Sequence, residues 1–436
     1  MRIFIIGQCS LHWGRMENGN IGNYYIVEPL IRELHRVFPD AEIVTTMQMT
    51  ERFQKTENVT VLPMDLYYAW NDDDLDIAKK EYEIAKEYAK TGVLKTKTPF
   101  IEEVLKSDIV LDLSGELWSS THADLVGKDR FEVGVLKDRI AQLLGKKTAL
   151  VVSGEGPFSE ATLQLAKETL ENFDLILNRE AESEKILKRE YGIDTSNVIS
   201  GACSSFLFEA EKDENIKQIL EDEKIVINGD KAIGFILCGF NMLQGPYDMK
   251  NRPDEDFYIF AEAVEYIVNH LHKRVVLMSH SNGFELPPNF KLINGRDYYI
   301  AEQLYRVLKT RNKIDINNVH LISKPYTPWQ TKAMIRNLEM LVTGRLHASV
   351  AGVSECVPTV VMMYGHGPIS HKTIGFHSIS GTTDYIAYPQ KKNDIISKID
   401  YCWNNRQAYR EFLKIKIPEV QKKVHLMFDM LLKLSR

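Results

Sequence analysis

The chain has 436 residues, of which 44% are hydrophobic and 26% charged, and its formal net charge is -6. This composition is that of a globular protein and excludes a disordered or fibrous chain, and the length fits two domains. The acidic balance argues against nucleic acid as a partner, because a protein that binds nucleic acid needs a basic face.

Short apolar runs alternate with helical patterns through the first half of the chain. The first run, Arg2 to Ile6, predicts a strand and is too short for the core of a signal peptide. Further strands are predicted at 41–45, 59–62, 109–113, 148–152 and 175–178, and a charged helix at 76–90. Strands that alternate with helices are typical of a parallel sheet covered on both faces.

A segment dense in charge, 209–231, interrupts this pattern and is predicted to be a linker. The residues before it, 1–208, form the predicted first domain, and residues 232–436 form the second. The second domain repeats the order of strands and helices, with strands expected at 232–237, 274–278, 319–322, 340–342 and 359–363. We therefore predict an α/β protein of two doubly wound, Rossmann-like domains that face a cleft.

The last segment of the chain has the spacing of an amphipathic helix. Val420, Val424, Phe428 and Leu431 lie on one helical face. We expect this helix to pack on the body of the second domain.

The strongest local signal for chemistry is the segment Gly344-Arg345-Leu346-His347, which follows an apolar strand and precedes small residues that begin a helix. Ligands of open α/β sheets bind beyond the carboxyl ends of strands, where the start of a helix favours anions. Arginine supplies a planar fork for a carboxylate or phosphate, and histidine exchanges a proton near neutral pH. The structural alternative is that Arg345 pairs with a local carboxylate and His347 caps the turn.

A glycine-bearing turn, Asn18 to Asn23, follows the first strand. Glycines let backbone amides approach a ligand closely, so this loop could hold a sugar or a phosphate group. The alternative is an ordinary turn.

Together these segments resemble the polysaccharide pyruvyl transferases, and the resemblance extends over most of the chain. It is carried by Gly344 to Ala348 after a strand, by Cys356-Val357-Pro358 before the next strand, and by Tyr364-Gly365 after it. Three further segments are similar to the family: Phe173 to Glu180 with Ser183 and Leu187, Met278-Ser279-His280, and Asp297 to Ala301.

The chain departs from this family's pattern at three positions. Asn23 stands where the family has an aspartate, Leu113-Ser114-Gly115-Glu116 stands where a glycine-rich triplet is usual, and Cys203 follows Ala202 where an aspartate is usual. All three lie in the predicted first domain, which the resemblance assigns to acceptor binding. The departures therefore affect the expected identity of the acceptor more than the expected donor chemistry.

The resemblance implies transfer of a pyruvyl group from phosphoenolpyruvate to sugar hydroxyls of a cell-surface polysaccharide or its precursor, forming a pyruvate ketal. Arg345 and His347 are then the catalytic candidates. The resemblance also implies donor and acceptor residues, with Lys372 and Arg179 as candidates for supporting charge. The donor candidates are Gly344, Arg345, Leu346, His347, Lys372, Arg179 and His280, and the acceptor candidates are Asn20, Gly22 and Asn23.

The partners expected from the sequence are phosphoenolpyruvate as co-substrate and a sugar acceptor that could be lipid-linked. No cluster of metal ligands stands out, so we expect neither a metal nor another cofactor. No apolar run approaches the roughly 20 residues of a membrane span, and five cysteines without a CxxC pair fit a reducing compartment. We expect a cytoplasmic protein, with peripheral contact at the inner face of the membrane allowed.

Two other functions fit the same pattern. A nucleotide-sugar-dependent glycosyltransferase of the glycosyltransferase-B type also uses two doubly wound domains and a basic site at a strand end. A non-catalytic carbohydrate-binding relative is consistent with the departures at Asn23, Glu116 and Cys203.

Overall fold

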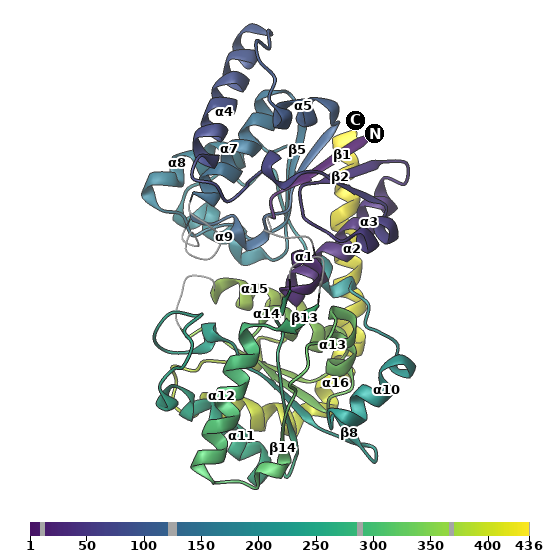
Figure 1. The fold of residues 1–436 in the computed structure, drawn as a ribbon, viewed down its shortest axis with the longest axis vertical. Coiled ribbons are helices and arrows are strands. Elements are labelled where there is room, and N and C mark those ends of the chain that lie inside the picture. The colour runs from purple at the N-terminus through teal and green to yellow at the C-terminus, as the bar shows by residue number, and fades with distance from the viewer. Residues whose placement is uncertain (9–13, 121–128, 286–290, 366–369, 436) are drawn as a thin grey trace. The chain divides into compact units, whose positions relative to one another are not determined.

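A computed structural model describes residues 1–8, 14–120, 129–285, 291–365 and 370–435 (Figure 1). The chain forms two compact units, each built on a parallel sheet. Unit 1 comprises Met1–Met16, Glu28–Ser204 and Lys422–Arg436, and unit 2 comprises Glu17–Val27 and Ser205–Gln421. The predicted fold class, two doubly wound α/β domains, is confirmed.

Unit 1 contains a seven-stranded sheet in the order β3-β2-β1-β4-β5-β6-β7. Its neighbouring strands all pair in parallel. The strands are β1 (Arg2–Ile6), β2 (Glu42–Thr45), β3 (Val59–Val61), β4 (Ile109–Asp112), β5 (Lys147–Ser153), β6 (Leu175–Asn178) and β7 (Val198–Ser200). Six of the seven were predicted within two residues; β7, three half-buried residues, was not predicted.

Helices complete unit 1 and cover its sheet. They are α1 (Arg15–Asn18), α2 (Ile21–Val37), α3 (Glu51–Glu57), α4 (Asp74–Thr91), α5 (Pro99–Lys106), α7 (Arg130–Leu143), α8 (Glu160–Glu171) and α9 (Ala181–Glu190), of which α1 and α2 lie partly in unit 2. One face of α4, α5 and α7 packs on the strands through Ala78, Val104 and Leu136, which join Phe4 and Val110 in one apolar core. This core forms because apolar residues recur at helical spacing on helices that return across a buried sheet.

Unit 2 contains a six-stranded sheet in the order β14-β11-β10-β15-β16-β17, again with parallel neighbours. The strands are β10 (Ile233–Ile236), β11 (Val275–Met278), β14 (Val319–Leu321), β15 (Met340–Thr343), β16 (Thr359–Met362) and β17 (Ile386–Ala387). Two antiparallel hairpins stand apart from the sheet: β8 (Val226–Ile227) with β9 (Asp230–Lys231), and β12 (Asn282–Phe284) with β13 (Leu292–Asn294).

The helices of unit 2 follow its strands in turn. They are α10 (Asp213–Asp222), α11 (Tyr258–His270), α12 (Arg296–Arg311), α13 (Pro328–Arg336), α14 (Leu346–Ser354), α15 (Ser370–Ser380) and α16 (Asp394–Asp429). Strands β10, β15 and β16 are buried along their whole length. That burial explains why their sequences are continuous apolar runs without alternation.

The predicted boundary at residue 208 is wrong at the start of the chain, because Glu17–Val27 belongs to unit 2. The first turns of α2 place Tyr24 and Tyr25 among aromatic side chains of unit 2. The Tyr25 ring lies 4.4 Å from that of Phe208, and the Tyr24 ring lies 5.0 Å from that of Trp329. The spacing of apolar residues predicts the helix but not the sheet on which each of its turns packs.

The segment 209–231 is not a linker. It forms α10 and the β8–β9 hairpin and belongs to unit 2. Ile216 is fully buried and Leu220 nearly so, one helical turn apart, and Asp213 pairs with Arg336 on α13. The dense charges form the solvated face of an amphipathic helix. Composition alone does not distinguish this helix from a linker, because it averages the charged face with the apolar one.

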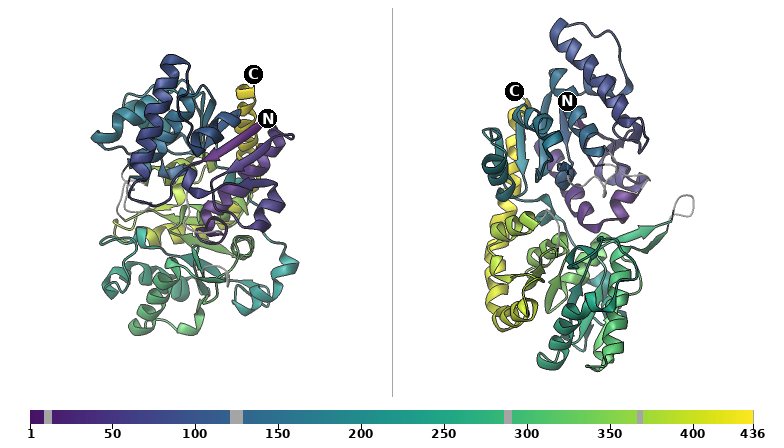
Figure 2. Two further views of the ribbon diagram at one scale, coloured as in Figure 1. Left: turned by 45° about the horizontal axis from the view of Figure 1, so that its top comes forward. Right: turned by 90° about the vertical axis from the view of Figure 1, so that its left-hand side faces the viewer.

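The helix predicted at the end of the chain is α16, yellow in Figures 1 and 2. Residues 422–436 belong to unit 1 instead of the second domain. Near its end Asp429 pairs with Arg36 of α2 at 2.8 Å. Val420, Val424, Phe428 and Leu431 are all buried, as the spacing predicted.

Candidate functional site

The segment from Gly344 to His347 lies where the connections of the unit 2 sheet change direction. The chain leaves β10 towards β11 and β14 on one side, and β15 returns to pair with β10 on the other. Gly344 and Arg345 follow β15, and α14 begins at Leu346. Open α/β sheets bind ligands at this switch point, so the fold places the segment where a site is expected.

Gly344 is required by a close approach of Asn241, which lies after β10 in the short 3-10 helix η5 (Gly239–Asn241). A Cβ atom at position 344 would stand 1.7 Å from the Asn241 Oδ1. The buried Asn241 side chain accepts from the Cys238 amide at 3.0 Å and donates to the Gly344 carbonyl at 3.3 Å. Asn241 therefore ties the carboxyl end of β10 to that of β15, a role that no local sequence pattern indicates.

The side chain of Arg345 forms a bidentate ion pair with Asp297 on the first turn of α12. Arg345 Nε donates to Asp297 Oδ2 at 2.9 Å, and Arg345 Nη2 donates to Oδ1. The arginine side chain is 10% exposed and the aspartate is fully buried. Burial opposes the charge, but the carboxylate of Asp297 outweighs it and raises the pKa of Arg345 above its ordinary value.

Asp297 is therefore the local carboxylate of the structural alternative, in which Arg345 serves only as an ion-pair partner. The pair uses Nε and Nη2, and among the described residues Nη1 has no hydrogen-bond partner. The Arg345 guanidinium also lies over the ring of Phe240, with Cζ 5.8 Å from the ring centroid. Asp297 thus fixes the orientation of a cation that keeps one donor group available.

His280 follows β11 and lies beside this pair. Its backbone amide donates to Asp297 Oδ2 at 3.3 Å, and its ring stands edge-on to Tyr25 at 5.3 Å. Burial, together with the positive charges of Arg345 and His347, lowers the pKa of His280 well below its ordinary value. The imidazole of His280 is therefore neutral at physiological pH.

The turn after the first strand packs against the same residues. Asn20 forms a β-bridge with Ser281, and its Oδ1 accepts from the amide of Gly22 at 3.1 Å, at the start of α2. A Cβ atom added at Gly22 would stand 2.8 Å from the His347 Cβ and 2.9 Å from its Nδ1. The acceptor candidates Asn20 and Gly22 therefore lie in unit 2, in contact with the donor candidates.

Lys372 is fully buried on α15, one helical turn before Phe376. The Phe376 ring stands edge-on to the His347 imidazole at 5.8 Å. Residues four apart share one face of a helix, so Lys372 lies on the face of α15 that packs towards α14.

Within unit 2 the structure thus brings together Arg345, His347, His280 and the Asn20–Gly22 turn. A sequence profile of the polysaccharide pyruvyl transferases matches residues 20–366, which is most of the chain and includes all of these positions. The chain belongs to the polysaccharide pyruvyl transferase family. It is accordingly a transferase, as the resemblance implied.

Solved structures similar to this pyruvyl transferase share its two-unit fold. A glycosyltransferase from Rickettsia africae has a TM-score of 0.56 at 11% identity, covering 99% of this chain and 98% of its own. HepE from Anabaena in complex with UDP has a TM-score of 0.57 at 10% identity, covering 100% and 98%. UDP-GlcNAc 2-epimerase from Methanocaldococcus jannaschii has a TM-score of 0.55 at 16% identity, covering 95% and 99%. At sequence identities this low, the structural similarity establishes only the glycosyltransferase-B-like fold. No curated protein sequence matches the chain significantly.

Other candidates in the pyruvyl transferase lie outside this group. Arg179 is buried at the carboxyl end of β6 in unit 1. Of the departures from the family pattern, Asn23 lies half-buried in the first turn of α2 and Cys203 is fully buried. The side chain of Glu116 lies outside the described residues.

The described part of the chain contains no group of three or more His, Cys, Asp or Glu side chains that could hold a metal ion. None of its helices combines the length and apolarity needed to cross a membrane.

If Gly22 holds His347 in place, a Gly22→Ala variant should lose roughly 100-fold in activity, because a displacement of about 1 Å in a catalytic group has effects of that size. Turnover at a saturating donor concentration measures this loss. A double variant, Gly22→Ala with His347→Gln, should be no worse than His347→Gln alone. Additive losses would show that Gly22 acts independently of His347.

His377 lies on α15 and joins it to α14 through a buried polar network. Its Nε2 lies 3.0 Å from the Ser349 Oγ on α14, and its Nδ1 lies 2.7 Å from the Thr382 Oγ1. Burial lowers the pKa of His377 to about 4, although its hydrogen bond with Thr382 opposes the shift. His377 therefore positions α15, which carries Lys372.

We expect this network to make folding stability depend on pH. The unfolded pKa of a histidine is near 6.5 and the folded pKa is lower, so protonation favours the unfolded chain. Stability from this group is complete above about pH 6.5 and falls by about 3 kcal/mol as the pH drops towards 4. Urea unfolding of the parent and of His377→Gln at pH 7 and pH 4.5 measures it. The stability difference between the two proteins should shrink at the lower pH, and a constant difference would contradict the account.

Proposed function

We propose that this transferase moves a pyruvyl group from phosphoenolpyruvate onto sugar hydroxyls of a cell-surface polysaccharide or its precursor, forming a pyruvate ketal. The observation that carries the proposal is the Arg345–His347 segment. It begins a helix at the switch point of a doubly wound sheet, in a chain of the pyruvyl transferase family.

The donor carries a carboxylate and a phosphate, and both must be neutralised. Arg345 offers its Nη1 in an orientation fixed by Asp297. The first amides of α14 have no acceptor inside the helix and lie at the positive end of its dipole. Lys372 lies one turn before Phe376 on α15, and Phe376 packs on His347 in the first turn of α14. We assign Gly344 to Leu346 and Lys372 to binding of the two anionic groups.

The reaction needs one proton on the methylene carbon and the loss of a proton from each attacking hydroxyl. Protonation of that carbon makes the adjacent carbon oxocarbenium-like, and the first sugar hydroxyl forms a C–O bond there. The second hydroxyl then displaces phosphate, which leaves with its bonding electron pair and takes up a proton. We assign the first proton transfer, or contact with the donor phosphate, to His347, which is partly exposed. Because His280 is buried and neutral, it suits hydrogen bonding better than proton donation.

We assign acceptor binding to the Asn20–Asn23 turn, because Gly22 packs closely against the His347 side chain. Arg179 stays a sequence-based candidate for a supporting charge. The four cysteines described by the structure are free thiols, which supports placing the protein in the cytoplasm, with contact at the inner face of the membrane allowed for a lipid-linked acceptor. The proposed chemistry uses no cofactor besides phosphoenolpyruvate as co-substrate.

Thermal unfolding with phosphoenolpyruvate, compared with a panel of nucleotide sugars, tests the donor. A ligand that binds only the native protein raises the melting temperature with its concentration. We expect a saturable rise with phosphoenolpyruvate that is abolished in His347→Gln combined with Lys372→Met. A rise with a nucleotide sugar alone would support the glycosyltransferase alternative, and no rise with either would support a non-catalytic relative.

A further inference from the structure

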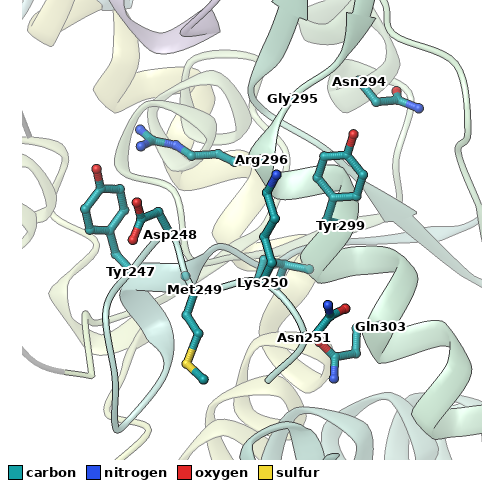
Figure 3. A pocket seen from close by; sticks show the side chains of 12 residues that line it. Tyr247, Asp248, Met249, Lys250, Asn251, Asn294, Gly295, Arg296, Tyr299 and Gln303 are labelled. Carbon is teal, nitrogen blue, oxygen red and sulfur yellow. The ribbon is translucent and has the colours of Figure 1, made fainter. Parts of the chain in front are cut away.

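Unit 2 contains a pocket of about 230 Å³ beside the candidate donor site (Figure 3). Three segments line it: the loop after β10, the end of β13 and the first turns of α12. The polar and aromatic side chains that line it are Tyr247, Asp248, Lys250, Asn251, Asn294, Arg296, Tyr299 and Gln303, so two cations face one carboxylate. Its volume is below the roughly 300–1,000 Å³ of pockets that enclose drug-sized ligands, so it suits about one sugar ring.

The loop that forms one wall of the pocket is held by buried polar contacts. The Arg252 side chain is buried and donates to the carbonyl of Gln244 at 2.8 Å and also to that of Pro246. Gln303 is buried too and accepts from the Arg252 amide at 3.2 Å. On the other side, a Cβ atom at Gly239 would lie 1.6 Å from the Tyr247 carbonyl oxygen. These contacts fix Tyr247 and the residues after it, so the pocket is built into the fold.

The lining combines aromatic faces with cations. Tyr299 is 48% exposed, and the Lys250 ammonium lies 5.8 Å from its ring centroid. Figure 3 draws the Lys250 side chain between those of Arg296 and Tyr299. Lys250 and Arg296 are both exposed, and neither forms an ion pair among the described residues; the Arg296 guanidinium lies over the Tyr247 ring, 5.1 Å from its centroid. An exposed tyrosine suits the apolar face of a sugar ring, while amides and cations suit hydroxyl and anionic groups.

The pocket and the donor candidates share two structural parts. The Phe240 ring stacks on Tyr247 at 4.7 Å, and the guanidinium carbons of both Arg296 and Arg345 lie within 6 Å of its centroid. Arg296 also directly precedes Asp297, the partner of Arg345. A ligand in this pocket would therefore be next to a donor bound at Arg345.

We infer that this pocket is the acceptor subsite and that it selects a sugar carrying an anionic group, either a phosphate or a carboxylate. This inference rests on the proposed pyruvyl transfer. Lys250 and Arg296 bind the anionic group, and Tyr299 packs on the sugar ring. It adds this pocket to the Asn20–Asn23 turn as a second acceptor contact within unit 2.

Calorimetric titration of the full chain tests the inference with three classes of sugar: hexose 1-phosphates, hexuronates and neutral methyl hexosides, each in the gluco, galacto and manno configurations. We expect at least one anionic sugar to bind about tenfold more tightly than its neutral counterpart. Lys250→Gln and Tyr299→Ala should each weaken that binding about tenfold. The matched controls are Lys309→Gln, an exposed lysine on the same helix as Tyr299, and Tyr401→Ala, a tyrosine that is 45% exposed on α16.

Titration with phosphoenolpyruvate on the same proteins separates this inference from the proposed function. Both pocket variants should bind phosphoenolpyruvate as the parent does. If phosphoenolpyruvate binds but no anionic sugar is preferred, or the pocket variants bind sugars like the controls, the inference is overturned and the donor assignment stands. If UDP binds and is weakened by both pocket variants, the pocket is a nucleotide site, which also overturns the inference. A parent that binds an anionic sugar in the pocket but not phosphoenolpyruvate would overturn the proposed donor instead.

Discussion

Replacement of Asp297 by alanine should destabilise unit 2 by about 3–5 kcal/mol, because removing one partner of a buried pair leaves the other charge uncompensated. The Asp297 carboxylate is fully buried and holds two nitrogen atoms of Arg345. It also accepts from the backbone amide of His280. Urea unfolding should show a lower midpoint, and phosphoenolpyruvate binding should be lost because Arg345 is no longer oriented.

Two further variants distinguish a buried pair from a general effect of mutation. Glu411→Ala removes one partner of an exposed pair with Lys414 and should change stability by less than about 1 kcal/mol. The double variant Asp297→Ala with Arg345→Met removes both charges and should recover much of the lost stability without recovering phosphoenolpyruvate binding. An Asp297→Ala protein as stable as the parent would contradict the ion pair that the structure shows.

Replacement of His347 by glutamine should lower the turnover number by about 10²- to 10⁴-fold, the range for a positioned general acid or base. Release of phosphate from phosphoenolpyruvate, with an extract of polysaccharide precursors as the acceptor, measures turnover. The affinity for phosphoenolpyruvate should change less than tenfold if His347 transfers a proton. A loss of affinity as large as the loss of turnover would instead assign His347 to donor phosphate binding.

The control for this variant is His272→Asn. His272 is exposed in unit 2 and has a positive φ of 53°, a conformation that asparagine tolerates well. This variant should turn over like the parent. Normal turnover in His347→Gln would remove His347 from the mechanism.

The strands of this fold were predictable because most of them are continuous apolar runs in buried parallel sheets, such as β10 and β15. The unit boundaries were not, because the packing partner of a helical face is decided by residues far away in sequence. Tyr24 and Tyr25 show the same spacing whichever sheet they cover, and their contacts with Phe208 and Trp329 are not local. The hairpin strands and β7 are too short to form a pattern.

The candidate site was predictable where one segment carries both the fold signal and the reactive side chains, as in Gly344 to His347. Its supporting residues were not predictable in the same way. Asp297 lies 48 residues from Arg345, and His377 lies 28 residues from Ser349, so neither pairing leaves a local pattern. The pocket around Arg296 and Tyr299 is assembled from three separate segments, and an exposed lysine or tyrosine on one of them looks like any other surface residue.

The most direct test of the account is a calorimetric titration of the purified chain with phosphoenolpyruvate in the presence of saturating UDP. The account predicts one saturable phosphoenolpyruvate site per chain, not displaced by UDP and abolished by combining His347→Gln with Lys372→Met. Saturable binding of UDP with no detectable binding of phosphoenolpyruvate would contradict it.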